Sequence, residues 1–102
     1  MDIIPIYRWS GNYFGFISND YFFDASGNYL GWIDEDGVWC SDGKYLGEIV
    51  KNNYILRRTD IVEPVPKVPR VPPVPLVPPV PLVDRVGLVE LVGWKDALDE
   101  FK

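Results

Sequence analysis

Among the side chains of this sequence, the carboxylates come closest to a pattern that could bind a cation or catalyse a reaction. Asp34, Glu35 and Asp36 are consecutive and could hold a cation, although they lack the ligand spacing of an EF-hand loop. Asp20 and Asp24 could act as a pair of catalytic carboxylates. Turn-forming residues surround both groups, so we interpret all five as residues of solvated turns and strand ends.

Nucleophilic, acid–base and metal chemistry lack the residues that usually support them. The chain contains no histidine, which removes the commonest general base and the commonest metal ligand. Cys40 is the single cysteine, and without a base to activate it we interpret it as a small buried or half-buried side chain. We therefore expect no enzymatic activity, no catalytic residue, no metal site and no cofactor.

The charge balance and the cysteine content limit the partners and the compartment. Fifteen Asp+Glu outnumber ten Lys+Arg and give the 102-residue chain a net charge of −5, which argues against nucleic acid and anionic membranes as partners. The first residues lack a basic region and a long apolar region, so we expect no signal peptide, and no run approaches the roughly 20 apolar residues of a transmembrane helix. Because one cysteine cannot form an internal disulfide, we expect a reducing compartment and a cytoplasmic protein.

Aromatic side chains offer a second kind of chemistry, the stacking of a sugar ring or a quaternary ammonium group. Several aromatic residues recur in register with the repeat described below, which favours a repeated core: Tyr13, Tyr29, Tyr45 and Trp39. Trp9 and Trp32 stand in less regular columns, so they are candidates for an exposed platform. A small-ligand or carbohydrate-binding module that uses these two rings is therefore our alternative function.

A phrase repeated three times organises the elements that would carry these side chains. The pattern Gly-x-Tyr-x-Gly-x-Ile begins at Gly11, Gly27 and Gly43, with an interval of 16 residues. A short apolar segment precedes each copy, and the same register aligns four of its residues in one column: Tyr7, Phe23, Trp39 and Ile55. Because turn-formers separate each segment from its copy, the sequence predicts β-hairpins arranged as an antiparallel meander.

The second glycine of each copy predicts close packing. Gly15, Gly31 and Gly47 lie inside the expected second strands, where a missing side chain lets another backbone or an aromatic ring approach. We expect the rings of the first-strand column to stack on these glycines.

The fourth copy of the repeat is incomplete. It begins at 54–58, but Thr59 and Ile61 replace the first glycine and the tyrosine, so a second strand could include at most residues 60–62. A single hairpin cannot bury its own apolar face, and closure of the array removes exposed edges. We therefore expect an all-β domain, residues 1–62, in which four short antiparallel hairpins of a 16-residue repeat close around a pseudo-four-fold axis.

These phrases resemble a bacterial family. The segments 4–11, 29–33 and 45–47 are similar to those of proteins described as four-fold β-flower domain proteins, as are the Pro-rich segment and the Trp-containing tail that follow. The resemblance implies four β-hairpins around a pseudo-four-fold axis. It implies no activity, because the family has no assigned function and no defined catalytic motif.

Residues 63–86, called the arm below, follow a period of three. Proline fills one column from Pro66 to Pro81, and valine fills the next: Val65, Val68, Val71, Val74, Val77, Val80 and Val83. Three is the period of a polyproline II helix, which at about 3.1 Å per residue would make residues 64–81 a rod of roughly 55 Å. That length is about twice the diameter of a compact domain of this size, so the rod must bend if it lies on its own domain.

The valine column distinguishes the arm from a plain linker. A linker is ordinarily polar, whereas a continuous apolar stripe marks an interaction surface. We expect the arm to dock on its own domain, to dock on a neighbouring chain, or to bundle with other arms. The basic residues beside a PxxP pattern in 67–73 offer a further alternative, an SH3-type ligand, although the regular period favours a structural rod.

The tail, residues 87–102, has a helical pattern. Trp94, Leu98 and Phe101 follow the i, i+4, i+7 spacing of one helical face. A helix this short is unstable alone, so we expect an amphipathic helix that anchors in a groove. The arm and the tail together predict a non-enzymatic protein-interaction or self-assembly module, in which the valine column and these three tail residues contact a partner.

Overall fold

The computed structural model describes residues 3–35, 37–60, 62, 64–73, 78, 82–85, 87 and 91–101. The elements within these residues are eight β-strands and one short 3₁₀ helix, which confirms the all-β class. They are β1 (Ile3–Tyr7), β2 (Tyr13–Ser18), β3 (Tyr21–Asp24), β4 (Tyr29–Asp34), β5 (Gly37–Cys40), β6 (Tyr45–Val50), β7 (Tyr54–Arg58), β8 (Trp94–Asp96) and the helix η1 (Ala97–Phe101).

The strands form one sheet that closes on itself. Each strand pairs antiparallel with the next along the chain, in the order β1 to β8. A parallel contact also joins β1 to β7, where Tyr7 N–H donates to Asn53 O at 2.9 Å and the Asn53 side-chain amide donates to Pro5 O at 2.8 Å. This contact closes β1–β7 into a barrel-like arrangement, and β8 is added beside β7.

The first three hairpins share one geometry. In each of them the pairing shifts by one residue at an equivalent position, immediately after Ile6, Phe22 and Val38. The glycine in each hairpin turn has a positive φ between 88° and 97°. Residues with a side chain rarely adopt this conformation, which explains the first glycine of the repeated phrase.

The second glycine of the phrase packs against backbone and not against a ring. A Cβ built on Gly15 would overlap the carbonyl oxygen of Phe23, and one built on Gly31 would overlap the carbonyl oxygen of Trp39. The expectation that first-strand rings stack on these glycines is therefore wrong. The first strand of the following hairpin lies so close that its backbone fills the space.

The fourth hairpin begins one residue later than the 16-residue register predicts. The turn before β7 holds three residues, 51–53, whereas the equivalent turn between β2 and β3 holds two, 19–20. A Cβ on Gly47 would clash with the carbonyl oxygen of Leu56. A Cβ on the equivalent glycine, Gly15 or Gly31, would clash with the carbonyl oxygen of a first-strand aromatic residue. Leu56, and not Ile55, therefore continues the column of first-strand rings.

The last strand completes the fourth hairpin from the far end of the chain. Thr59 N–H donates to Gly93 O at 2.8 Å, and β8 pairs antiparallel with the whole C-terminal half of β7. The two strands of this hairpin are therefore joined by residues 59–93, which include the arm.

Two sequence expectations for this region are wrong. The second strand expected at residues 60–62 is not formed by the described residues there, because β8 takes the place beside β7; residue 61 lies outside the described residues. A single amphipathic helix does not carry Trp94, Leu98 and Phe101, since Trp94 lies in β8 and only the other two lie in the 3₁₀ helix. Pairing with β7 satisfies the backbone of residues 94–96, whereas a short helix has little stability of its own.

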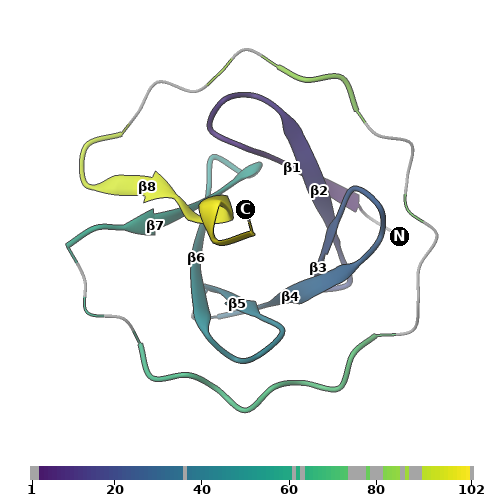
Figure 1. The fold of residues 1–102 in the computed structure, drawn as a ribbon, viewed down its shortest axis with the longest axis vertical. Helices are drawn as coiled ribbons and strands as arrows, with labels where there is room; N and C mark the ends of the chain where they lie inside the picture. The colour runs from purple at the N-terminus through teal and green to yellow at the C-terminus, as the bar shows by residue number, and fades with distance from the viewer. Residues whose placement is uncertain are drawn as a thin grey trace.

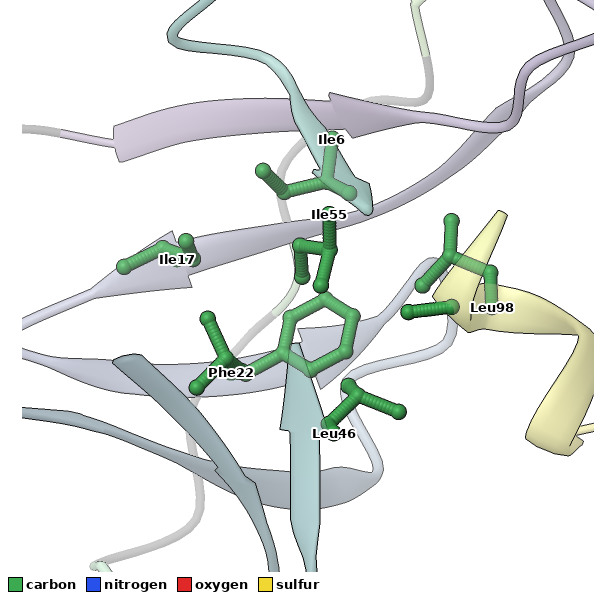
Figure 2. Packing of buried hydrophobic residues seen from close by; sticks show 8 residues of the cluster. Ile6, Ile17, Phe22, Leu46, Ile55 and Leu98 are labelled. Atoms are coloured by element: carbon green, nitrogen blue, oxygen red, sulfur yellow. The ribbon is translucent and has the colours of Figure 1, made fainter. Parts of the chain in front are cut away.

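The axial core takes apolar residues from most strands and is closed by the tail. Figure 2 shows side chains from several strands and from η1 pointing toward one centre. The buried members are Ile6, Ile17, Phe22, Val38, Leu46, Ile55, Ala97 and Leu98. Because 0% of Leu98 is exposed, the tail supplies part of the core itself.

Candidate interaction surface

The described parts of the arm lie against the outer side of the sheet. In Figure 1, residues 64–73 pass below the β5–β6 hairpin and residues 82–85 pass along the upper edge outside the β1–β2 hairpin, while η1 lies near the centre. Each segment donates a backbone hydrogen bond to a turn of the repeat. The described segments of the arm therefore contact the sheet of their own chain.

The first contact, called the Gly43 seat, uses the turn between β5 and β6. Lys67 N–H donates to Gly43 O at 2.8 Å. A Cβ at Gly43 would overlap the Lys67 carbonyl oxygen, so glycine is required here both by its φ of +95° and by the docked arm. The arm backbone consequently lies directly on the turn.

The Lys67 side chain reaches inward from this seat. Its Nζ lies 2.7 Å from Asp34 Oδ2 and 4.5 Å from the centre of the Trp39 ring. Asp34 Oδ1 accepts a hydrogen bond from Trp39 Nε1 at 3.1 Å, and only 17% of the Asp34 side chain is exposed. Partial burial strengthens an ion pair relative to one in open solvent. Asp34, expected to be a solvated turn residue, is therefore an anchor for the arm.

The second contact, called the Gly11 seat, repeats this arrangement on the turn between β1 and β2. Arg85 N–H donates to Gly11 O at 2.8 Å, and a Cβ at Gly11 would overlap the Arg85 carbonyl oxygen. The Arg85 guanidinium lies 4.0 Å from the centre of the Tyr7 ring. A hydrogen bond with Tyr54, assisted by Tyr7, raises the pKa of Arg85 above its already high value, so this cation stays charged.

Asp84 adds a hydrogen-bond acceptor beside the Gly11 seat. Its carboxylate accepts from the Tyr13 backbone N–H at 2.7 Å and from the Asn12 side-chain amide at 2.8 Å. The backbone hydrogen bond, followed by the side-chain one, holds the pKa of Asp84 below its usual value. Because the folded-state pKa is lowered, this support is present at neutral pH and is lost as the pH falls through that pKa.

The tyrosine of the repeated phrase holds the ring under each cation. Tyr13 meets Tyr7 with ring centres 5.7 Å apart, and Tyr45 meets Trp39 with ring centres 5.3 Å apart, both edge-on at 70°. Burial raises the pKa of both Tyr13 and Tyr45, so their hydroxyl groups stay neutral well above pH 7. These rings therefore form the inner wall of the seats.

The two seats combine the register of the repeat with that of the arm. Gly11 and Gly43 are two repeat units apart, and Lys67 and Arg85 are 18 residues apart, so six triplets of the arm span two hairpins. The sequence alone did not lead us to predict docking roles for the two cations and their acidic neighbours: Lys67, Arg85, Asp34 and Asp84. The signal that points to them is the third column of the period-three pattern, in which basic residues interrupt proline and leucine.

The valine side chains of the arm point away from the seats. The described members of the column are almost fully exposed: Val65 (84%), Val68 (87%), Val71 (83%) and Val83 (88%). The remaining members lie outside the described residues: Val74, Val77 and Val80. With the cations inward and the valines outward, the arm displays a row of apolar side chains to solvent. The four described valines are called the valine row below.

The three tail residues expected to contact a partner contact their own sheet. Leu98 is buried in the axial core, and Phe101 lies against the Phe14 ring with ring centres 5.9 Å apart. Trp94 lies under the Arg58 guanidinium, 5.8 Å from the ring centre. Because β8 and η1 are elements of the closed fold, these side chains serve packing.

Trp32 does not belong to an exposed platform. Only 1% of its surface is exposed, and it packs with Trp39 and Tyr45. The Arg70 guanidinium of the arm lies 5.2 Å from its ring centre. The expectation that Trp32 is exposed is wrong, because neighbouring rings and the arm cover it.

Trp9 is half-buried and lies beside a shallow hollow. The hollow has a volume of about 380 Å³, and Trp94, Arg8 and Asp99 also line it. Arg8 Nη2 donates to Asp99 Oδ1 at 2.7 Å across its edge. Trp9 is thus the one ring of the expected platform that can meet a solute.

The other carboxylates considered from the sequence serve turns. The Asp24 carboxylate accepts the backbone N–H groups of Ser26 and Asn28 at 2.9 and 3.0 Å. Asp20 adopts a φ of 65° in the turn between β2 and β3. Asp36 lies outside the described residues.

Cys40 is half-buried at the end of β5. Burial, followed by the nearby charges of Asp42 and Glu100, raises the pKa of its thiol from 9.0 to about 11. The thiolate is therefore scarce at neutral pH, and the side chain packs against the axial core.

Fold and seats together define an all-β protein whose sheet closes on itself and whose arm docks on repeated turns. The profile of the 4-fold beta flower protein family matches residues 4–88, so the chain belongs to that family. The match includes both seats and continues through the arm. Neither a curated protein nor a solved structure matches the chain. Within the described part of the chain, no helix has the length and apolar character needed to cross a bilayer.

Proposed function

We propose that this chain is a non-enzymatic protein-interaction or self-assembly module that associates through the valine row. The observation that carries the proposal is that more than four-fifths of each valine in the row is exposed. Soluble monomers rarely keep a large contiguous apolar surface in water without a use for it. Because the seats hold the inner side of the arm, its outer side is free to meet another molecule.

The repeat and the arm have a regular geometry in this proposal. We infer that four hairpins of one 16-residue repeat surround a pseudo-four-fold axis and that the arm is a polyproline II segment bent around them. Support comes from the pairing shifts shared by three hairpins, from β8 beside β7 and from the arm's period of three. A stiff arm of this kind loses little conformational entropy when a partner binds.

The proposal is tested by replacing Val65, Val68 and Val71 with threonine in the full-length chain. Threonine keeps the β-branched shape but adds a hydroxyl group, so the arm should stay docked while its outer surface loses apolar character. Sedimentation velocity over a wide concentration range should show that the wild-type chain associates. The triple variant should associate at least tenfold more weakly.

The matched control changes apolar residues of similar shape away from the arm. Ile3 and Ile4 are 41% and 40% exposed at the start of β1, and Ile3→Thr with Ile4→Thr should leave association unchanged. If the wild-type chain has the mass of a single chain at the highest concentration, self-association is excluded. Only a different protein can then be the partner. Equal weakening by both sets of substitutions would exclude the valine row.

A catalytic role is not part of this proposal. The Asp24 carboxylate is engaged in a turn and the Asp34 carboxylate holds the arm, and the raised pKa of the Cys40 thiol, about 11, keeps it protonated. The single cysteine supports a reducing compartment, and we propose the cytoplasm.

A second candidate function, the binding of a small ligand or a carbohydrate, rests on the hollow beside Trp9. Two indole rings and an Arg8–Asp99 ion pair border it, a combination that suits stacking of a sugar ring with polar contacts at its edge. Titration of soluble oligosaccharides should shift the Trp9 and Trp94 indole N–H signals in NMR spectra. Trp9→Ala should remove the response, and shifts of equal size in that variant would exclude the hollow as the site.

A further inference from the structure

We propose that the two seats are recognition sites for a basic residue in an extended proline–valine peptide, and that they accept the arm of a second copy of this chain in place of their own. The proposal concerns the inner side of the arm, so it does not depend on the valine row. It assigns a binding site to the turns of the repeat.

The Gly43 seat is built by the sheet alone. Its acceptor is the Gly43 carbonyl in the β5–β6 turn, its aromatic wall is Trp39 in β5, and its carboxylate is Asp34 in β4. The ligand contributes only an extended backbone and one cationic side chain, Lys67, while Arg70 reaches the same carboxylate at 3.8 Å. Any chain that presents these groups at this spacing meets the same contacts.

The Gly11 seat shares two of these contacts, the turn carbonyl and the aromatic ring, but its carboxylate belongs to the arm and binds groups of the β1–β2 hairpin instead of the cation. A turn carbonyl accepts the Arg85 N–H, an aromatic ring lies under the guanidinium, and an acidic residue of the arm, Asp84, binds the Tyr13 backbone next to it. Two sites that share a turn carbonyl and an aromatic ring, two repeat units apart, indicate a recognition rule that the repeat generates more than once. A cation-binding aromatic face favours lysine and arginine over neutral residues.

The arm of a second copy is the occupant that the structure already shows to fit. Residues 64–73 occupy the Gly43 seat within one chain, and the identical segment of another chain offers the identical groups. The arm lies within the connection of the fourth hairpin, residues 59–93, and three residues of β8 fasten the far end of this connection to β7. Exchange of an identical element between copies is a low-cost route to a dimer.

The direct test measures binding of a fluorescein-labelled peptide of residues 64–73 to full-length chains by fluorescence anisotropy. The receptor is the variant Lys67→Ser with Arg70→Ser, whose own arm competes weakly for the Gly43 seat. The peptide should bind this variant at least tenfold more tightly than it binds the wild-type chain. Adding Asp34→Asn to the receptor, or serine at both basic positions of the peptide, should weaken binding at least tenfold.

Each other outcome overturns the proposal. If the peptide does not bind the Lys67→Ser, Arg70→Ser variant, called the opened receptor, then the seat does not recognise a separate chain. Equal binding of the basic and serine peptides excludes the cation as the recognised group. Equal binding to the wild-type and opened receptors places the peptide elsewhere. The triple threonine variant of the valine row should bind the peptide as its parent does, so failure of the proposed function remains distinguishable from failure here.

A measurement on the wild-type chain decides the matter even where the opened receptor does not fold. Equal amounts of ¹⁴N- and ¹⁵N-labelled full-length chains are mixed, and a carbodiimide joins Lys67 to Asp34. Exchange predicts cross-linked peptide pairs of hybrid isotopic mass, with a share that rises with protein concentration. Hybrid pairs that are absent at every concentration would exclude the second copy as the occupant.

Discussion

At the scale of single residues, a turn glycine of the repeat and a basic residue of the arm act together. A turn glycine without a Cβ lets the arm backbone settle on its carbonyl, and the basic residue of the arm then reaches an aromatic face. Each cation–aromatic contact contributes about 0.5–2 kcal/mol, so docking depends on several contacts acting together. Glycine thus has two roles in the turn, which can be tested separately: it leaves room for the arm, and it allows a positive φ.

The substitution Gly43→Ala tests this separation. It introduces a side chain at a φ of +95° and into the position of the Lys67 carbonyl oxygen, so it should release the arm. Limited trypsin digestion should then cut after Lys67 at least tenfold faster than in the wild-type chain.

Gly93→Ala is the matched control for that substitution. Gly93 has a φ of +86°, but nothing lies within 4 Å of a Cβ built on it. This variant should lose about 1–3 kcal/mol to backbone strain, while the rate of cleavage after Lys67 stays near the wild-type rate. Equal acceleration in both variants would show that strain alone, and not the clash, governs the arm.

The Cys40 thiol gives the fold a dependence on alkaline pH. Its folded-state pKa of about 11 lies above its ordinary value, so the unfolded chain loses this proton first as the pH rises. The contribution to stability is complete below the ordinary pKa and is lost as the pH rises toward the folded-state value. Urea unfolding at pH 7 and pH 10.5 should show a larger loss for the wild-type chain than for Cys40→Ala, and equal losses would contradict the raised pKa.

At the scale of elements, the fourth hairpin explains the order of the chain. Its first strand is β7, its second is β8, and the connection between them contains the arm. The tail therefore has to return to the sheet, where Leu98 enters the axial core beside Ile55. A chain that ends before β8 would lack both the strand and this core residue.

The substitution Leu98→Ala measures how much the tail contributes to the fold. Leu98 is 0% exposed, so its truncation should lower the free energy of unfolding by about 2–5 kcal/mol. Glu100→Ala in the same helix, where 56% of the side chain is exposed, should change it by less than about 0.5 kcal/mol. Similar losses in the two variants, measured by urea unfolding, would mean that η1 does not close the core.

The sequence predicted the elements with local signals and missed those that depend on distant contacts. The repeated phrase predicted the all-β class, because turn glycines and alternating apolar residues act within a few positions of one another. The tail was wrongly predicted as one amphipathic helix, because its pairing partner β7 lies about 40 residues earlier in the sequence. The anchoring role of Asp34 was missed for the same reason, since Lys67 reaches it only once the arm has turned back.

At the scale of the whole molecule, the chain forms a disc of 36 × 35 × 23 Å, and the described arm segments lie along its rim (Figure 1). The net charge of −5 makes the sheet a favourable surface for a segment that carries Lys67, Arg70 and Arg85. The arm thus has two chemically different sides, a basic inner side for the seats and an apolar outer side for a partner. The proposed function uses the outer side, and the recognition of a second copy uses the inner side.

Hydrogen exchange of the arm amides, detected by NMR, tests most directly whether the inner side of the arm is docked on the turns. The Lys67 and Arg85 N–H groups donate to Gly43 O and Gly11 O at 2.8 Å, so they should exchange at least tenfold more slowly than the N–H of Val68. The same contrast should persist at low protein concentration, because the seats are occupied within one chain. Exchange of the Lys67 and Arg85 amides as fast as that of Val68 would show that the arm is not seated and would contradict the account.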